Sequence, residues 1–182
     1  MQQSVAMSRF EAITTERLVL RRLTPDDAPV MAAYRSDPEI ARYQDWTEAD
    51  PIALAAFFAE LEAIDPGRPP GPWFQIGVAE RATGALVGDC GLHVRPDEPD
   101  TAELGYTLAG GYHRRGYATE AAAALCQWAL SELKLARVLA TTDARNLPSI
   151  RVLERLGMTR ISCVETFFRG EPCVELGYEL RP

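Results

Sequence analysis

Lysine is nearly missing from this chain of 182 residues. Lys134 is the only lysine among 19 basic residues, whereas Asp and Glu number 26, so the formal net charge is −7 and the isoelectric point is about 4.9. An acidic surface repels phosphate backbones, which argues against a protein that coats nucleic acids and is compatible with a cationic substrate. Arginine pairs with phosphate in a planar fork better than lysine does, although a bias in genome composition explains the same usage.

Disulfide and metal-binding patterns are also missing. The four cysteines form no CxxC pair, and His93 and His113 have no metal-ligand spacing, which predicts reduced thiols, no metal ion and a cytoplasmic protein. The first residues lack the apolar core of a signal peptide, and no hydrophobic run reaches the length of a membrane span. We therefore expect no membrane association, and we expect residues 1–14 to form a flexible tail before a single domain at 15–182.

What the chain does contain is a succession of strand-like and helix-like segments, with 47% hydrophobic residues to build a core. Thr24, followed by proline and two acids, starts a helix over 24–37, and "DPGRPPGP" at 65–72 is a loop. The predicted strands lie at 17–23, 73–80, 85–95, 101–109, 136–143 and in a final hairpin over 158–180 that turns at Arg169–Gly170; further helices lie at 51–64, 118–134 and 147–157. This order predicts an α+β fold with a mixed central sheet of about seven strands flanked by about four helices, rather than a doubly wound dinucleotide fold.

The segment "GGYHRRGYATEA" at 110–121 joins a predicted strand to a predicted helix. The first N–H groups of a helix lack acceptors, and the helix dipole places partial positive charge there. Gly116 and Ala118 leave room for a bulky anion, and Arg114 and Arg115 add charge, so the segment could hold a pyrophosphate. It matches neither GxxxxGK[ST] nor GxGxxG, and a plain loop before a buried helix stays open as the alternative.

Three stretches together, "ELGYTL", "HRRGYATEA" and "ARNLPSIRVLERLGM", resemble the GNAT superfamily of acyl-CoA-dependent N-acetyltransferases, and within it the branch of the ribosomal-protein N-terminal acetyltransferases. His113 stands where that family usually has glutamine or arginine. The resemblance runs from Thr15 to the end of the chain, and "RLVLRRLTPDDA" and "LVGDCGLH" also match it. It implies a GNAT-like single domain with splayed central strands and acetyl-CoA as cosubstrate.

The resemblance also implies where acetyl-CoA binds. The backbone at Tyr106, Thr107 and Leu108 pairs with the pantetheine arm, and a strand N–H near Leu108 polarises the thioester carbonyl. Asn146 contacts the cofactor and Ser149 lies near the departing sulfur, although both residue types are also favoured at a helix start. The residues expected to hold the diphosphate are His113, Arg114, Arg115, Gly116, Tyr117, Ala118 and Thr119.

Transfer to an amine requires loss of a proton from an alkyl ammonium. Glu103 and His93 are the leading candidate bases, with Asp45 as a third, and Ser149 is the candidate acid for the leaving thiolate. Glu103 shares one face of its strand with Gly105 and Thr107. A pairing of Glu103 with an arginine, or the protonation of the thiolate by solvent, would remove these roles.

The segment "RYQDWTE" is expected to wall the acceptor site, with Tyr43, Asp45, Trp46 and His93 as substrate-binding residues, whereas Tyr34, Trp73 and Phe168 are interpreted as core residues. The acceptor is an amine on a protein N-terminus or on a small molecule, and a homodimer is left open. Two alternatives remain: a non-catalytic acyl-CoA-binding or sensing module, and an interaction domain that uses the aromatic residues around Trp46.

Overall fold

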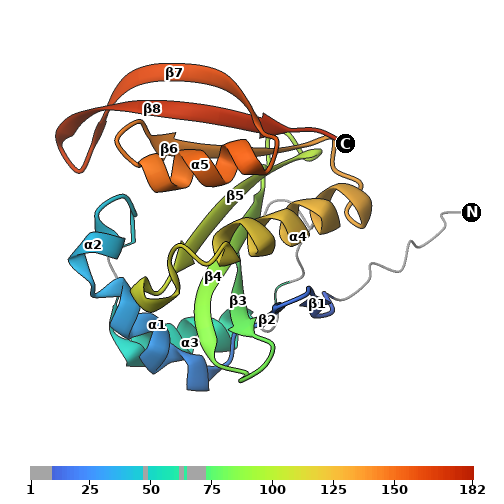
Figure 1. Cartoon of the computed structure of the whole chain (residues 1–182), viewed down its shortest axis with the longest axis vertical. Coiled ribbons are helices and arrows are strands. Elements are labelled where there is room, and N and C mark those ends of the chain that lie inside the picture. Colours follow the sequence, from blue (N-terminus) through green and yellow to red (C-terminus); the bar gives the residue numbers. More distant parts are fainter. Residues whose placement is uncertain (1–9, 47–48, 62–63, 65–72) are drawn as a thin grey trace, which may run out of the picture.

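The structure is a computed structural model that describes residues 10–46, 49–61, 64 and 73–182. Its described part contains a sheet of eight strands in the order β1-β2-β3-β4-β5-β6-β8-β7 (Figure 1). All neighbouring strands are antiparallel except β5 and β6, which are parallel. The strands are β1 (Ile13–Thr14), β2 (Leu18–Arg22), β3 (Phe74–Glu80), β4 (Leu86–Val94), β5 (Thr101–Leu108), β6 (Arg137–Asp143), β7 (Thr159–Phe168) and β8 (Glu171–Leu180).

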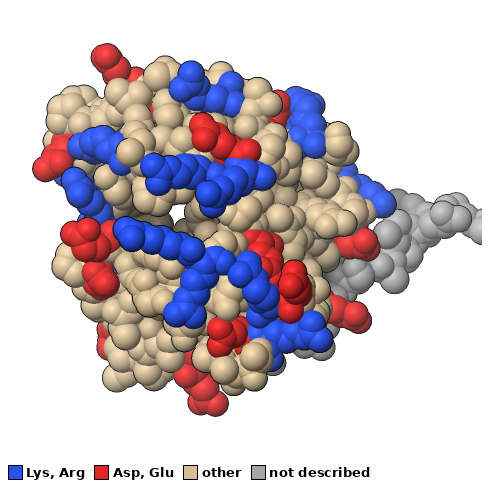
Figure 2. All heavy atoms as spheres, in the orientation of Figure 1, with Lys and Arg blue, Asp and Glu red and all other residues tan. Residues whose placement is uncertain are grey.

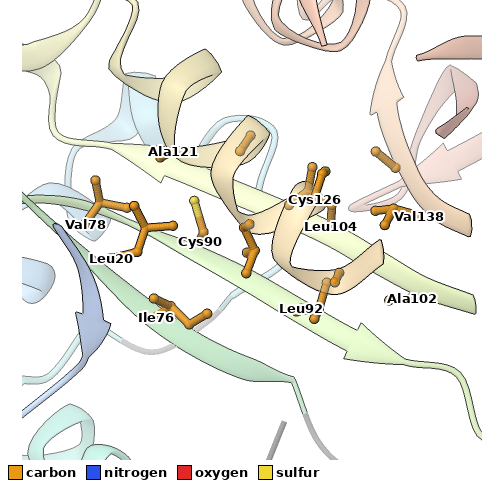
Figure 3. Packing of buried hydrophobic residues seen from close by; sticks show 14 of the residues in the cluster. Leu20, Ile76, Val78, Cys90, Leu92, Ala102, Leu104, Ala121, Cys126 and Val138 are labelled. Carbon is orange, nitrogen blue, oxygen red and sulfur yellow. The ribbon is translucent and has the colours of Figure 1, made fainter. Parts of the chain in front are cut away.

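Helices cover both faces of this sheet. They are α1 (Ala28–Arg35), α2 (Pro38–Ala41), α3 (Pro51–Leu61), α4 (Tyr117–Ser131) and α5 (Leu147–Arg155), with short 3₁₀ turns η1 (Pro25–Asp27) and η2 (Gly110–Tyr112). α4 packs on β3, β4 and β5 through a large apolar cluster that includes Leu92, Leu104 and Leu125 (Figure 3). A second cluster places Met31 of α1 and Phe58 of α3 against Leu86 of β4. The predicted α+β class with a mixed central sheet is confirmed.

The helix predicted over 24–37 is divided. Thr24 and Asp27 form a reciprocal cap at the start of η1, and Asp27 is held by Arg21 at 2.7 and 2.8 Å. α1 ends at Arg35 because Pro38 cannot continue a helix, and Asp37 caps α2 instead by accepting from the Glu39 N–H. The predicted helix therefore becomes η1 and α1, and α2, which follows it, was not predicted.

The first and last residues that the structure describes belong to the fold. The final hairpin turns at Arg169–Gly170, as predicted, with φ of 52° and 81°, the left-handed pair typical of a tight hairpin turn. Residues 1–9 of the predicted tail and the predicted loop at 65–72 lie outside the described residues. The remainder of the predicted tail belongs to the fold, because Phe10 is 5% exposed and packs edge-on against Phe74 and Trp128.

Candidate active site

Strand β5 has a free edge where the sheet splits. β5 and β6 pair only from Thr101↔Arg137 to Glu103↔Leu139, whereas β6 stays paired with β8 as far as Asp143. Beyond Glu103, no described strand pairs with β5 on its β6 side. The Ala109 N–H bonds to the Val87 carbonyl on β4, and because donors alternate sides along a strand, the Leu108 N–H points into the opening. The predicted splay of the central strands is confirmed.

The start of α4 presents unpaired donors beside this opening. The first intrahelical bond runs from the Glu120 N–H to the Gly116 carbonyl, so the N–H groups of Tyr117, Ala118 and Thr119 have no acceptor in the helix. The Thr119 hydroxyl oxygen is buried and has no hydrogen-bond partner in the described part of the chain. Three backbone donors and one hydroxyl, at the positive end of a helix dipole, fit a diphosphate group.

The backbone at Gly116 requires glycine. Gly116 precedes the first helical residue with φ of 80°, a left-handed conformation, and a Cβ built there would lie 3.4 Å from Nη2 of Arg17. Arg114 also has a left-handed φ of 62°, and the side chains of Arg114 and Arg115 are exposed. In Figure 2 basic side chains border both sides of an opening in this face of the molecule, although the net charge of the whole chain is −7.

Arg17, which precedes β2, contacts the loop before α4 and the first turn of α4. It donates to the Arg115 carbonyl at 2.8 Å and pairs with Glu120 at 2.6 Å, and its Cζ lies 4.8 Å from the Tyr117 ring centroid. The Tyr117 hydroxyl donates to Glu80 on β3 at 2.9 Å. These contacts use side chains and a carbonyl, so the loop is fixed while its N–H groups stay free. The sequence interpretation did not include Arg17.

His113 contacts the strand instead of pointing its ring at the helix start. Its Nε2 lies 2.9 Å from the Leu108 carbonyl oxygen, a contact that bends the loop back toward β5. The carbonyl of Leu108 is therefore occupied, whereas its N–H is not. Here the short imidazole reaches the nearest carbonyl, and the role predicted for His113 in binding the diphosphate stays a prediction.

Tyr106 joins β5 to α5 across the opening. Its hydroxyl lies 2.8 Å from Ser149 Oγ and donates to the Ser149 carbonyl at 3.2 Å. Asn146 caps α5 by accepting from the Ser149 N–H at 3.3 Å. Burial raises the pKa of Tyr106 above its ordinary value, so the phenol stays protonated at neutral pH. Ser149 thus carries a hydrogen-bonded hydroxyl at the inner side of the split sheet, and Asn146 fixes the helix that holds it.

The face of the sheet opposite α4 carries the other polar residues. The register pairs three residues of β4 with three of β5 on this face: Asp89 with Thr107, Gly91 with Gly105 and His93 with Glu103. Trp73 lies over the two glycines, since a Cβ at Gly91 would stand 2.9 Å from its ring. The Trp73 ring also stacks on His93 with centroids 5.4 Å apart and is 38% exposed, so its interpretation as a core residue is wrong.

Glu103 and His93 are neighbours at the point where the strands separate. Glu103 is the last β5 residue paired with β6, and its side chain is 38% exposed. Its oxygens lie 3.8 Å from His93 Nδ1 and 3.6 Å from Arg95 Nη1, both longer than a hydrogen bond. The Glu103 carboxylate is therefore accessible to solvent and lies near Arg95. The geometry is compatible both with a role as the general base and with a pairing of Glu103 with an arginine.

Asp89 is a buried carboxylate on the same face. It is 2% exposed and accepts hydrogen bonds from the Tyr34 hydroxyl and from the Gln75 amide. Burial raises the pKa of Asp89, and nearby Arg35 opposes that rise. Tyr34 is a core residue, as predicted, but its hydroxyl belongs to this polar group. The cluster could not be found by spacing, because its three residues come from α1, β3 and β4.

The predicted acceptor wall follows α2. Arginines lie over both of its aromatic rings: Arg42 over Tyr43 at 5.4 Å and Arg35 over Trp46 at 4.6 Å. Asp45 is exposed. Arg169, at the tip of the β7–β8 hairpin, donates to the Trp46 carbonyl at 3.3 Å, so the hairpin reaches this wall. Phe168, interpreted as core, is half-buried beside that tip.

Among the described residues, no three His, Cys, Asp or Glu side chains are placed to hold a metal ion. None of the helices described is long and apolar enough to cross a membrane. The site consists of backbone donors, hydroxyls and carboxylates around a split sheet, which is the arrangement of an acyl-transferring enzyme that binds a diphosphate-bearing cosubstrate.

Comparison with known proteins agrees with this class. Residues 17–159 match the model of the acetyltransferase (GNAT) domain. The chain is 31% identical over 170 residues to the uncharacterized N-acetyltransferase YnaD of Bacillus subtilis (strain 168), covering 92% of this chain and 90% of that one. A GNAT-family acetyltransferase from Bacillus anthracis superposes with a TM-score of 0.78 at 28% identity, covering 94% and 98% of the two chains. A putative ribosomal-protein-serine acetyltransferase from Vibrio cholerae gives 0.76 at 27%, covering 97% and 100%.

The chain belongs to the GNAT acetyltransferase family, and it is an N-acetyltransferase. The resemblance seen in the sequence, including that to the ribosomal-protein branch, is confirmed.

Proposed function

We propose that the protein transfers an acetyl group from acetyl-CoA to a primary amine, on a small molecule or a protein N-terminus, by direct attack within a ternary complex. The observation that carries this proposal is the set of unpaired donors at the start of α4, from Tyr117 to the buried Thr119 hydroxyl, beside a strand with a free edge. A plain loop before a buried helix would not leave a buried hydroxyl without a partner.

Acetyl-CoA supplies the activated acetyl thioester. Its diphosphate would be held by the N–H groups of Tyr117, Ala118 and Thr119, with Arg114 and Arg115 adding charge at the rim. The free edge of β5 would pair with the amide arm, using the backbone between Tyr106 and Leu108. In this proposal His113 shapes the loop through its contact with Leu108 and does not bind phosphate.

The acceptor amine must be neutral when it attacks. Glu103 would take the ammonium proton, directly or through a water, because it lies where the strands separate and its side chain is accessible. His93, paired with Glu103, and Asp45 are the other candidate bases. The Leu108 N–H points into the opening and would stabilise negative charge that develops on the acetyl oxygen.

The leaving thiolate needs a proton. The hydroxyls of Tyr106 and Ser149 share a hydrogen bond at the inner side of the opening, and the raised pKa of Tyr106 keeps its proton in place. Either hydroxyl can donate a hydrogen bond to a thiolate that departs between β5 and α5, and solvent then supplies the proton, because a raised pKa makes the phenol a weaker acid. Ser149 is thus supported in its predicted place, with Tyr106 added as its partner.

The test is an assay for the free thiol of CoA with a panel of amines and N-terminal peptides, run beside thermal unfolding with and without acetyl-CoA. We expect Glu103→Gln to lower kcat by about a hundredfold, the lower range for general base catalysis, without weakening acetyl-CoA binding. Glu165→Gln, at an exposed position on β7, is the matched control.

The other outcomes of these assays point to different conclusions. A rate like that of the wild type in Glu103→Gln removes Glu103 from the mechanism. Stabilisation by CoA with no thiol release for any amine would identify a non-catalytic acyl-CoA-binding module instead. The absence of both acetyl-CoA binding and thiol release would refute the proposal. We further propose that the predicted domain, extended at its start to include Phe10 and β1, acts as one catalytic unit in the cytoplasm.

A further inference from the structure

Two unsatisfied donors lie together on the acceptor side of the sheet. Nε of Arg35 and Nε1 of Trp46 are both buried, and neither has a hydrogen-bond partner among the described residues. The Arg35 guanidinium carbon lies 4.6 Å from the Trp46 ring centroid, so the two donors belong to one cluster. Buried donors are normally paired, and two orphans in contact point to a missing acceptor.

The neighbouring carboxylates do not supply that acceptor. Asp89 is close enough to act on Arg35 electrostatically, but its oxygens accept from Tyr34 and Gln75. Asp45 adjoins Trp46 in the chain and is exposed, and neither donor is satisfied by it. A positive charge and an indole N–H are therefore left for a group from outside the chain.

The cluster is placed to meet an acceptor. Arg35 is the last residue of α1, which packs on the face of the sheet opposite α4, the face that carries His93 and Glu103. Arg169 donates to the Trp46 carbonyl from the hairpin tip, so the backbone that carries the indole is held in place. Trp73 covers Gly91 and Gly105, so an amine that binds beside the Trp73 ring on this face would have Glu103 toward one end and Arg35, near Asp89, toward the other.

We propose that the acceptor amine carries a carboxylate, and that Arg35 and Trp46 bind it. A guanidinium edge with an adjacent indole N–H offers donors to both oxygens of one carboxylate, and a charge-assisted contact of this kind is strong. The inference rests on the proposed function and names its substrate class: a free amino acid or an acidic peptide, rather than a polyamine or an aminoglycoside. It reverses the expectation of a cationic acceptor that the net charge of −7 suggests.

The test uses acceptor pairs that differ only in the carboxylate. In one arm, free α-amino acids are compared with their carboxamides. In the other, tripeptides with Asp or Glu at the second and third positions are compared with the Asn and Gln versions. We expect kcat/KM for the carboxylate member to exceed that of its partner by about tenfold or more in one of the arms, which identifies the source of the carboxylate.

Two variants locate the effect. Arg35→Gln is expected to raise KM for the carboxylate acceptor about 10- to 100-fold while leaving the neutral partner and acetyl-CoA binding unchanged. Trp46→Phe keeps the ring under Arg35, removes the N–H donor and is expected to raise the same KM by a few-fold. If Arg35→Gln does not fold, Trp46→Phe alone tests the site. Arg160→Gln, on the exposed start of β7, is the control for loss of one positive charge.

The same pairs are titrated calorimetrically against CoA-saturated protein, so that binding is measured apart from turnover. A carboxylate preference in binding that Arg35→Gln abolishes supports the site even if no acetyl transfer occurs, in which case only the proposed function fails. Equal binding and equal kcat/KM within every pair, or a preference that survives in both Arg35→Gln and Trp46→Phe, would overturn the inference.

Discussion

Replacing Thr119 by valine should change stability and cofactor affinity in opposite directions. Valine keeps the shape of threonine and removes the hydroxyl, which in this structure is buried and has no partner. An unsatisfied buried polar group costs about 1–3 kcal/mol, so its removal should stabilise the ligand-free protein by about 1 kcal/mol, the low end of that range. For a chain of this size that corresponds to an increase in Tm of about 2–4 °C.

The same substitution should weaken acetyl-CoA. If the hydroxyl donates to the diphosphate, a hydrogen bond to a charged group worth about 1.5–3 kcal/mol is lost, and Kd should rise by about tenfold or more. At a fixed ligand concentration well above Kd, the stabilisation by acetyl-CoA falls by the same free energy. Without ligand, the Tm of the variant should therefore be higher than that of the wild type. On addition of acetyl-CoA, the Tm of the variant should rise by less.

Differential scanning calorimetry over a range of acetyl-CoA concentrations measures both effects in one experiment. Thr159→Val, at an exposed position at the start of β7, is the matched control and should leave both quantities near their wild-type values. A Thr119→Val protein that is less stable without ligand, and that binds acetyl-CoA as tightly as the wild type, would refute the proposal that the donors at the start of α4 bind the diphosphate.

Two further outcomes test the local geometry. Gly116→Ala should destabilise the protein by about 1 kcal/mol or more, because alanine is strained at φ of 80°. Gly111→Ala, where a Cβ meets nothing within 4 Å, is the comparison in thermal unfolding. Burial opposes ionisation of Asp27, but hydrogen bonds from Arg21 and Thr24 outweigh it and hold the pKa of Asp27 below its ordinary value of 3.8. Its stabilising contribution is therefore complete above that ordinary value and is lost as pH falls through the lower folded pKa. Asp27→Asn should flatten the acid side of the stability curve below about pH 4, measured by urea unfolding, and an unchanged pH dependence would contradict this account.

The loop that we assign to the cosubstrate could be located from the sequence because its determinants are local. The loop from His113 to Thr119 follows a strand and opens a helix within a few residues, so glycine placement and free helix donors could be inferred from composition and order. Asn146 and Ser149 likewise begin α5, as the helix-start pattern indicates. The orientation of His113 was not accessible, because it depends on which carbonyl its ring can reach.

The acceptor side was less accessible because it depends on strand register and on packing between distant segments. Trp73 lies over Gly91 and Gly105 only because β3, β4 and β5 align them, and no spacing in the chain reveals that alignment. Arg35 ends α1 and Trp46 follows α2, eleven positions later, and their contact depends on the path of the chain between the two helices. Overall charge cannot decide the acceptor, since it describes the whole surface and not one cleft.

The short ladder between β5 and β6 has a consequence for how the domain holds together. Among the residues that the structure describes, three residue pairs join strands β1–β5 to strands β6–β8 within the sheet. The hydrogen bond between Tyr106 and Ser149 bridges the opening farther along. A molecule whose amide arm pairs with the bare edge of β5 would act as an extra strand at that seam. The hydrogen bonds that bind the cosubstrate would then also bind the two halves of the enzyme to each other.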